Sequence, residues 1–353
     1  MKAPIGIGYL SFAHGHVQLY ADVMKHFADV RQLIGYDDSE ARGRPVCESA
    51  GMRYTPHIED VLEDPEVQAV VIGSETSRHE ELCVAAAQVG KHILLQKPLA
   101  FSLDACARIK DAVNRAGIHF AMAFQMRHDP ANLRIREIVH SGMLGDIAVI
   151  RRRHCIGVLL MDSFINGPTR WHIEAEKNKG MFMDDAVHPA DWFHWIFGKP
   201  VSVMAEIGNI ITNVAPDDNG YAIYRFGRGE LGTIFNSSVV LAAEGTTEIY
   251  GSRGVLIQNY GDGPGCAAPR CPEGPALKVF RYGESRWDVQ EVPIPPGGQG
   301  DRIRNVPRPW IDSLINETPP PASLEDGCVA SEMILGAYQS SETGKRVPFP
   351  LAP

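Results

Sequence analysis

Residues 4–17 read PIGIGYLSFAHGHV, and the predicted fold starts from this stretch. A short apolar run at 4–9 leads through a turn of small and polar residues into an amphipathic segment. Four apolar residues of that segment recur at spacings of three and four, which predicts one buried helical stripe: Val17, Tyr20, Met24 and Phe27. A strand that turns directly into a helix presents backbone N–H groups and the positive end of a helix dipole, which together can bind phosphate.

The same alternation of short apolar runs and helical segments continues to about residue 124. Further apolar runs are predicted as strands at 31–36, 69–73, 92–95 and 119–124. One helix is predicted at 80–89 and is closed by Gly90, and another follows Ser102 as N-cap and ends before Gly117. This order is typical of a parallel sheet with crossover helices.

After residue 124 the pattern changes. It predicts a helix at 132–141, a strand at 147–153 and a helix at 185–197, and then alternating runs that share one face at Val201, Val203, Ala205 and Ile207. Residues 221–226 turn through 227–229 into 231–240, as in a hairpin. The Gly- and Pro-rich residues 251–298 are predicted to form an irregular excursion around one or two strands. The second half therefore contains a sheet built largely from hairpins.

Composition limits the class of protein. The 353 residues exceed the size of one hydrophobic core, which favours two domains. The net charge is -9 and the Lys and Arg residues are scattered, so we expect no nucleic-acid partner. Seven dispersed cysteines, with Cys266 and Cys271 the closest pair, predict reduced thiols in a cytoplasm. The sequence shows neither a leader nor an apolar run of membrane-spanning length, so we expect no membrane partner.

Two features of the first half suit a dinucleotide. Residues 11–16, SFAHGH, are the best frame for a phosphate-binding turn, with Ser11 and Ala13 where the fingerprint prefers Gly. Asp37 ends the second strand, where a carboxylate commonly accepts hydrogen bonds from the adenosine ribose. Asp37 and Asp38 would repel a 2′-phosphate and no Arg follows immediately, which favours NAD over NADP. A plain structural turn and two solvated acids are the alternative interpretations.

Five blocks resemble, in the same order, motifs of the glucose-fructose oxidoreductase and inositol dehydrogenase (Gfo/Idh/MocA) family. They are GKHILLQKPLA at 90–100, TSRH at 76–79, QMRHDP at 125–130, DDAVHPAD at 184–191 and the tail at 340–350. The chain departs from the family at several positions, which leaves cofactor affinity and substrate open: Gln96 for Glu, Ser11 and Ala13 for Gly, Glu75 for Pro, and residues 178–180 for a triple glycine.

The resemblance implies an α/β protein with an N-terminal Rossmann domain at 1–124. A C-terminal α/β domain at 125–353 would contain a large open, mainly antiparallel sheet whose outer face often makes oligomer contacts, so we expect a homodimer or homotetramer. It also implies a bound NAD and a carbohydrate or polyol substrate. The cofactor residues would be Ser11, Phe12, Ala13, His14, Asp37, Ser74, Thr76, His79, Gln96, Lys97 and Gln125.

Alcohol oxidation needs a base and a cation near the developing alkoxide. By the resemblance Lys97 would hydrogen-bond the reacting hydroxyl. Histidine titrates near pH ~6.5, so His188 is the predicted general base. Asp184 lies four residues before it and could orient the ring or bind a substrate hydroxyl. Asp191 shares that face, and Pro189 is expected in the first helical turn. Asp191 and His194 are expected to be structural.

Substrate contacts are expected from the second domain. Trp171 offers an apolar face to a sugar ring, and the candidate hydroxyl partners are Arg127, His128, Asp162, Asn166, Arg170 and His172. No ligand spacing supports a metal site from His154, Cys155, His172 and His194, so none is predicted.

Three functions remain open at this point. The main hypothesis is a dehydrogenase that releases NADH. The second is an enzyme that retains NAD and uses a transient oxidation to assist elimination or glycoside cleavage. The third is a cofactor-binding regulator or scaffold on the same fold, because fold does not dictate function.

Overall fold

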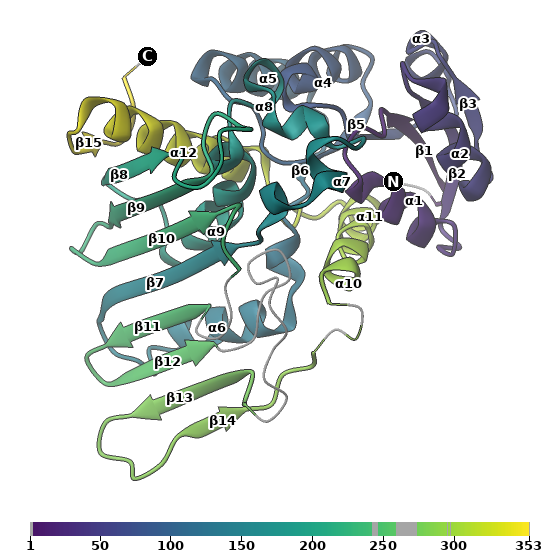
Figure 1. The fold of residues 1–353 in the computed structure, drawn as a ribbon. Coiled ribbons are helices and arrows are strands. Elements are labelled where there is room, and N and C mark those ends of the chain that lie inside the picture. The colour runs from purple at the N-terminus through teal and green to yellow at the C-terminus, as the bar shows by residue number, and fades with distance from the viewer. Residues whose placement is uncertain (1–2, 242–245, 259–273, 295, 297, 353) are drawn as a thin grey trace. The chain divides into compact units, whose positions relative to one another are not determined.

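The computed structural model describes residues 3–241, 246–258, 274–294, 296 and 298–352 (Figure 1). The chain divides into two compact units. The first consists of Met1–Gln125, Glu176–Asn178 and Ile303–Cys328, and the second contains the remaining residues. The sequence prediction assigned 303–328 to the second domain, whereas in the structure this segment packs with the first unit.

The first unit contains a six-stranded parallel sheet in the order β3-β2-β1-β4-β5-β6. The strands are β1 (Ile5–Leu10), β2 (Val30–Tyr36), β3 (Arg53–Thr55), β4 (Ala69–Ile72), β5 (His92–Leu95) and β6 (Phe120–Met122). Five of them confirm the predicted apolar runs. The sequence analysis missed β3, because its three residues Arg53–Thr55 do not form an apolar run.

The helices of the first unit pack around this sheet. They are α1 (His16–Met24), α2 (Glu40–Ala50), α3 (Glu59–Leu62), α4 (His79–Gln88), α5 (Leu103–Ala116) and α11 (Pro307–Asn316). The predicted caps of α5 are confirmed: the Ser102 side chain accepts a hydrogen bond from the N–H of Ala105, and Gly117 adopts a left-handed conformation with φ 64°. Val17, Tyr20 and Met24 of α1 are fully buried, whereas Phe27 lies beyond the end of the helix and is only partly buried.

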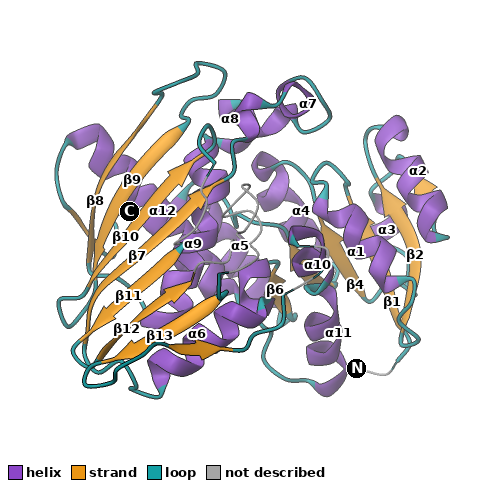
Figure 2. Cartoon of the chain, turned by 60° about the horizontal axis from the view of Figure 1, so that its bottom comes forward, coloured by secondary structure: helices purple, strands orange, loops and turns teal. Residues whose placement is uncertain are grey.

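The second unit contains a nine-stranded sheet in the order β14-β13-β12-β11-β7-β10-β9-β8-β15. Figure 2 shows strands of this sheet side by side in orange. The strands are β7 (Ile147–Cys155), β8 (Ser202–Gly208), β9 (Asn219–Arg225), β10 (Leu231–Ser237), β11 (Thr247–Gly251), β12 (Gly254–Gln258), β13 (Leu277–Arg281), β14 (Asp288–Gln290) and β15 (Val347–Pro348). The pair β7 and β10 is parallel and the other described pairs are antiparallel. The predicted open, mainly antiparallel sheet is therefore confirmed.

Two details of this sheet differ from the sequence prediction. Residues 251–298 contain three described strands, β12, β13 and β14, rather than one or two. Val201 lies outside β8 and its side chain is 44% exposed, so it does not share the buried face of Val203 and Ala205. Cys266 and Cys271 lie outside the described residues.

The helix α9 (Met181–Phe197) is buried on almost all sides and lies against β7 and β10. Large apolar side chains of α9, such as Trp192 and Phe193, are fully buried, and its Asp184, His188 and Asp191 are buried as well. The prediction that it begins near residue 185 was wrong. Since α9 starts at Met181, Pro189 lies in the interior of the helix and not in its first turn. In the interior a proline removes one backbone hydrogen-bond donor from the helix.

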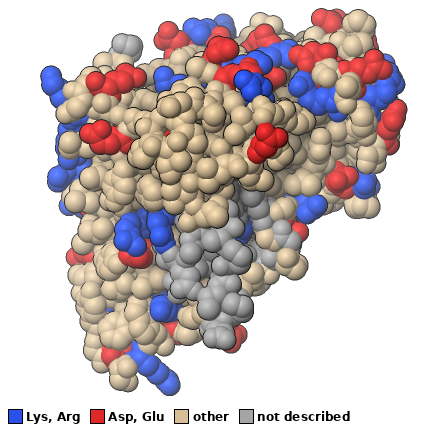
Figure 3. All heavy atoms as spheres, viewed as in Figure 1, with Lys and Arg blue, Asp and Glu red and all other residues tan. Residues whose placement is uncertain are grey.

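Three more helices of the described chain are α6 (Pro130–His140), α7 (Asp162–Ile165) and α12 (Leu324–Thr343). Short helices α8 (Ala175–Asn178) and α10 (Gln299–Arg304) complete the list. None of the helices in the described part of the chain is both long and apolar enough to cross a bilayer. On the face drawn in Figure 3, basic and acidic side chains are interspersed and form no continuous basic stripe.

Candidate active site

The predicted cofactor residues gather at one edge of the six-stranded sheet. They follow the carboxyl ends of β1, β2, β4, β5 and β6, and parallel strands end at the same edge. Strand β1 lies between β2 and β4. After β1 the chain adds β2 and β3 on one side of it and then β4, β5 and β6 on the other. Open α/β sheets bind ligands outside the carboxyl ends at such a switch point.

The turn after β1 is organised by its own side chains. Ser11 has φ 72°, a left-handed conformation that Gly adopts more readily, which explains why the fingerprint prefers Gly there. The Ser11 hydroxyl accepts a hydrogen bond from the N–H of Ala13 at 3.2 Å. The N–H of His14 donates to the carbonyl of Gly73 at 2.8 Å, which ties the turn to the end of β4. The geometry supports a compact binding turn although two of the usual glycines are missing.

Asp37 is fully buried and organises the same turn. Its carboxylate accepts hydrogen bonds from the N–H of Phe12 at 2.7 Å, the N–H of Ser39 at 2.8 Å and the guanidinium of Arg42 at 3.0 Å. A ribose hydroxyl would therefore donate a further hydrogen bond to a carboxylate that already accepts several from the protein. The role of Asp37 in ribose binding stays a prediction.

Two arginines near Asp37 were missed by the sequence analysis. Arg42 is the third residue of α2 and pairs with Asp37 and Asp38, and Arg78 donates to Asp38 at 3.0 Å. No Arg follows Asp37 immediately in the sequence, yet the fold brings two beside it. Arg42 lies five residues after Asp37, in the first turn of α2. It can be predicted from the sequence only if the first turn of the following helix is considered together with the residues adjacent to Asp37.

Buried amide and hydroxyl groups at this edge are suited to a bound dinucleotide. Both polar atoms of the Gln125 side chain are buried and have no hydrogen-bond partner among the residues that the structure describes. Buried polar groups are nearly always hydrogen-bonded, so Gln125 has capacity for a ligand. Ser74, shortly after β4, is fully buried, and the hydroxyl of Thr76 donates a hydrogen bond to the Asn178 side chain at 2.7 Å. These residues fit the NAD that the sequence predicts.

Lys97 follows β5 directly, and the residues on both sides of it are anchored. Gln96, which replaces the family's Glu, is fully buried and donates to the hydroxyl of Tyr20 at 2.8 Å. On the other side, His79 Nδ1 lies 2.8 Å from the carbonyl oxygen of Pro98. Burial lowers the pKa of His79 to about 4, so the ring is neutral at neutral pH and Nδ1 donates this hydrogen bond. Lys97 is 3% exposed, so its ammonium group lies at a shielded strand end.

The second unit places Asp184, His188 and Asp191 on α9. Their spacing of four and three residues puts them on one helical face, and all three are buried. Asp191 forms a buried ion pair with Arg127, with 2.6 Å between Oδ1 and Nη2. The His188 ring stacks on the His154 ring of β7 with 5.5 Å between centroids. His154 is a fully buried neighbour to which the sequence analysis assigned no role in catalysis.

The predicted substrate residues fall into a buried and an exposed group. Arg127 is engaged with Asp191, and burial lowers the pKa of His128 to about 4. Asp162 and Arg170 are exposed. Trp171 and His172 are buried and stack face to face with centroids 3.6 Å apart, so His172 covers one face of the indole. Substrate binding by these residues stays a prediction.

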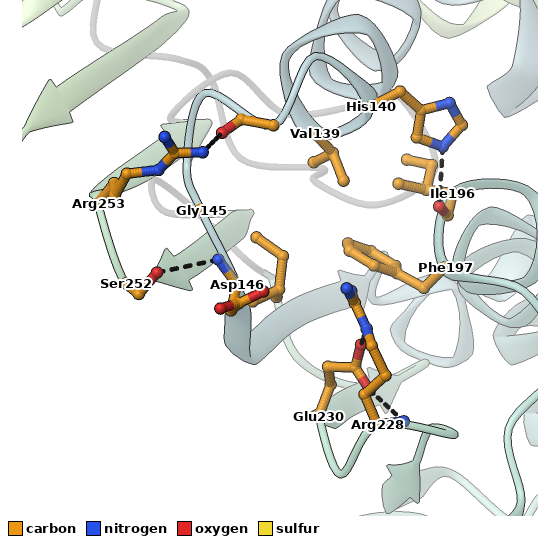
Figure 4. Close-up of a pocket in the computed structure, with 12 residues that line it drawn as sticks. Val139, His140, Gly145, Asp146, Ile196, Phe197, Arg228, Glu230, Ser252 and Arg253 are labelled. Carbon is orange, nitrogen blue, oxygen red and sulfur yellow. Dashed lines mark hydrogen bonds and ion pairs between the residues drawn. The ribbon is translucent and has the colours of Figure 1, made fainter.

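The second unit also contains a cavity of about 620 Å³ that none of the predicted site residues lines (Figure 4). Several of its polar side chains are already engaged by the protein. His140 pairs with the carbonyl of Ile196 at 3.0 Å, Arg253 donates to the carbonyl of Gly142, and Arg228 pairs with Glu230.

Comparisons with known proteins define the class. A family model described as "Oxidoreductase family, NAD-binding Rossmann fold" matches residues 3–124, and one described as "GFO/IDH/MocA C-terminal domain" matches residues 132–257. The chain belongs to the Gfo/Idh/MocA family of oxidoreductases. It is an NAD-binding enzyme with a Rossmann domain, as its sequence predicted.

Named relatives are sugar and cyclitol dehydrogenases. The chain is 27% identical to myo-inositol 2-dehydrogenase of Thermotoga maritima over 72% of its own length and 73% of that protein. It is 25% identical to levoglucosan dehydrogenase of Pseudarthrobacter phenanthrenivorans, over 82% of its length and 83% of that protein. A solved structure of levoglucosan dehydrogenase with NADH and levoglucosan matches with a TM-score of 0.83 and 20% identity, covering 98% of this chain and 99% of that one. That structural match supports the fold.

Proposed function

We propose that the chain is an NAD-dependent dehydrogenase that transfers a hydride between nicotinamide and a secondary alcohol of a sugar, a cyclitol or a related polyol. The observation that carries the proposal is the set of shielded acid-base groups: Lys97 at the carboxyl end of β5, and Asp184 and His188 on one face of α9. The relatives named for inositol and levoglucosan support the substrate class.

In this proposal Lys97 and His188 act on the same substrate hydroxyl. The Lys97 ammonium donates a hydrogen bond to the hydroxyl oxygen and stabilises the negative charge that develops there. His188 accepts the hydroxyl proton as the carbon is oxidised. Bound NAD supplies the hydride acceptor. Asp184, one helical turn before His188, orients the imidazole or binds a neighbouring hydroxyl of the substrate.

We also propose that NAD is preferred over NADP. The carboxylates near the end of β2 outnumber the arginines, four to two: Asp37, Asp38, Glu75 and Glu81 face Arg42 and Arg78. Because the cluster is net negative, a 2′-phosphate would meet more repulsion than attraction. The two arginines are already paired with carboxylates and would have to exchange partners to bind a phosphate.

The test is a screen for NADH formation over sugars, cyclitols and sugar acids, run with the wild type, Lys97→Met and His188→Asn. We expect kcat on an accepted substrate to fall by about 10²- to 10⁴-fold in both variants, because each removes a proton-transfer or charge-stabilising group. Lys110→Ala and His194→Asn are matched controls, since Lys110 forms an exposed pair with Glu325 and His194 is half-buried at the other end of α9.

The outcomes separate the open functions. Wild-type rates in both Lys97→Met and His188→Asn would remove the mechanism. Substrate conversion without accumulation of NADH, by protein that retains its NAD, would favour the redox-neutral alternative. No turnover of any polyol by NAD-loaded wild-type protein would favour a regulator.

A further inference from the structure

The start of α9 is held by side chains from two distant segments. Asp217 lies just before β9, and its Oδ1 accepts a hydrogen bond from the N–H of Phe182 at 2.6 Å. Its Oδ2 accepts one from the hydroxyl of Tyr338 at 2.7 Å, and Tyr338 belongs to α12. The Tyr338 oxygen in turn accepts the N–H of Met183 at 3.1 Å. The first N–H groups of a helix have no partner inside it, so Asp217 and Tyr338 together cap α9 from outside.

The residue before α9 must be Gly for this cap to form. A Cβ atom on Gly180 would lie 2.0 Å from Oδ2 of Asp217 and 2.7 Å from the Tyr338 hydroxyl oxygen. Gly180 has φ 174°, an extended conformation that any residue adopts, so the requirement is for space. Asp217 and Tyr338 therefore occupy the volume in which the side chain of an ordinary N-cap residue would lie.

The capped turn lies directly beside the proposed catalytic residues. Asp184 directly follows Met183. His188 comes five residues after Met183, which is about 7.5 Å along the helix axis. The ring of Phe182 packs edge-on against Tyr338 with 6.0 Å between centroids, so apolar packing reinforces the hydrogen bonds. A shift of the first turn would move Asp184 and His188 with it, and a misplacement of about 1 Å can cost roughly 10²-fold in rate.

We propose that Asp217 and Tyr338 are positioning residues for hydride transfer: by capping α9 they fix where Asp184 and His188 stand relative to the substrate hydroxyl. This inference rests on the proposed function and extends it to two residues that contribute no group to the reaction itself. They act through the helix.

The charge of this cap depends on pH. Burial and, to a smaller extent, the charge of Asp218 raise the pKa of Asp217 to about 6, although the hydrogen bonds from Tyr338 and Phe182 and the charge of Lys179 oppose the rise. The negative charge of Asp184 is one of the causes that raise the pKa of Tyr338. Above about pH 6 Asp217 is a carboxylate, and below that pH it is a neutral carboxyl, the form that the fold favours because its pKa is raised. The hydrogen bonding of the cap, and with it the placement of α9, should therefore change as the pH passes through about 6.

The experiment compares steady-state kinetics of Asp217→Ala, Asp217→Asn and Tyr338→Phe as functions of pH. We expect kcat to fall about 10- to 100-fold in Asp217→Ala and about 10-fold in Tyr338→Phe, with KM for NAD within twofold of wild type. Asp217→Asn keeps a carbonyl acceptor for Phe182, so it should recover most of kcat at neutral pH and lose the part of the pH profile near pH 6.

Two controls separate positioning from a general loss of structure. Asp218→Asn changes the adjacent carboxylate, which accepts from Ile210, Ile211 and Thr212 and not from α9. Tyr224→Phe removes another buried tyrosine hydroxyl, which donates to Met333 of α12. Tyr224→Phe should change stability without changing the pH profile of kcat. Asp218→Asn should leave kcat at neutral pH near that of the wild type and, because Asp218 raises the pKa of Asp217, move the step near pH 6 to lower pH.

The possible outcomes are distinct. If folded Asp217→Ala and Tyr338→Phe keep wild-type kcat, KM and pH profile, the positioning role is overturned while the dehydrogenase remains. If wild-type protein oxidises no polyol at all, the proposed function is overturned and the positioning role with it. Equal losses in the Asp218 and Tyr224 controls would also overturn the role, because they would show that stability alone sets the rate.

Discussion

The starts of α1 and α9 are built in different ways. Before α1, residues of the turn bind one another: Ala13 donates to Ser11, His16 to the ring of His14, and Val17 to the carbonyl of His14. Before α9, the partners of the first helical N–H groups come from positions 35 and 155 residues away. The N–H groups of His16 and Val17 at the start of α1 are bound within the turn itself, whereas those of Phe182 and Met183 at the start of α9 are bound by residues far away in the chain.

This difference continues along α9. Asp185 accepts a hydrogen bond from Ser238, and Trp192 donates to Asn132, 53 and 60 residues away. Asp191 pairs with Arg127 over 64 residues. Because α9 depends on so many distant partners, we expect substitutions there to affect stability and rate together, whereas the α1 turn should tolerate change better.

The largest effect is expected from breaking the buried ion pair of α9. Asp191→Ala removes the carboxylate from the buried Arg127 guanidinium, and such a loss typically costs about 3–5 kcal/mol of unfolding free energy. Urea denaturation of the apo-protein measures it. Glu174→Ala breaks an exposed pair with Arg170 at 3.7 Å and should cost less than about 1 kcal/mol. Equal costs in the two variants would contradict the view that α9 is held by its distant partners.

A second test compares the two glycines that precede these helices. At Gly180 an added Cβ meets Asp217 and Tyr338, so Gly180→Ala should cost about 1–3 kcal/mol and lower kcat. At Gly15, with φ -58°, the position of a Cβ has no heavy atom within 4 Å among the described residues. Gly15→Ala should therefore change stability by less than about 1 kcal/mol. A tolerated Gly180→Ala would mean that the cap does not need the space.

Two buried groups, one in each unit, should also respond to acid in opposite directions. The pKa of His79 is lowered to about 4, so folding favours its neutral form, and stability is lost as the pH falls from about 6.5 towards 4. The pKa of Asp217 is raised to about 6, so its contribution is fully present below its unfolded value near 3.8 and is lost as the pH rises through about 6.

Unfolding free energies between about pH 4.5 and 7 measure these contributions. His79→Gln keeps a donor for Pro98 and should flatten the acid loss of stability, whereas Asp217→Asn should steepen it. His128, whose pKa is also lowered to about 4, adds to the loss in every variant. The same change of slope in both variants would show that one of the two assigned directions is wrong.

The local features of the molecule were predictable from its sequence. The strand runs, the Ser102 cap and the buried stripe of Val17, Tyr20 and Met24 follow from periodicity and capping chemistry within a few residues. The carboxyl-edge location of Lys97 follows from its place after a predicted parallel strand. These predictions needed no knowledge of which distant segments meet.

The cap of α9 was missed because it depends on long-range packing. Asp217 follows Pro216 and precedes a strand, and nothing in its neighbourhood indicates a helix cap 35 residues away. The early start of α9 was missed because its first turn, Met181–Asp184, lacks a capping side chain of its own. Arg42 was missed because the search for a phosphate-binding Arg was restricted to residues adjacent to Asp37.

The smallest predicted effect concerns that arginine and the choice of cofactor. Arg42→Ala removes one of two cations from a cluster that already contains more carboxylates, so discrimination against NADP should increase by about 2- to 5-fold, in line with a partly exposed pair worth roughly 0.2–1 kcal/mol. Arg44→Ala, which breaks an exposed pair with Glu40 on the same helix, should leave the ratio unchanged. The ratio of kcat/KM for NAD and NADP measures both. If Arg42→Ala instead improved the use of NADP, Arg42 would act by shaping the start of α2 and not by its charge. The cofactor preference would then depend on the tertiary fold, as the placement of α9 does.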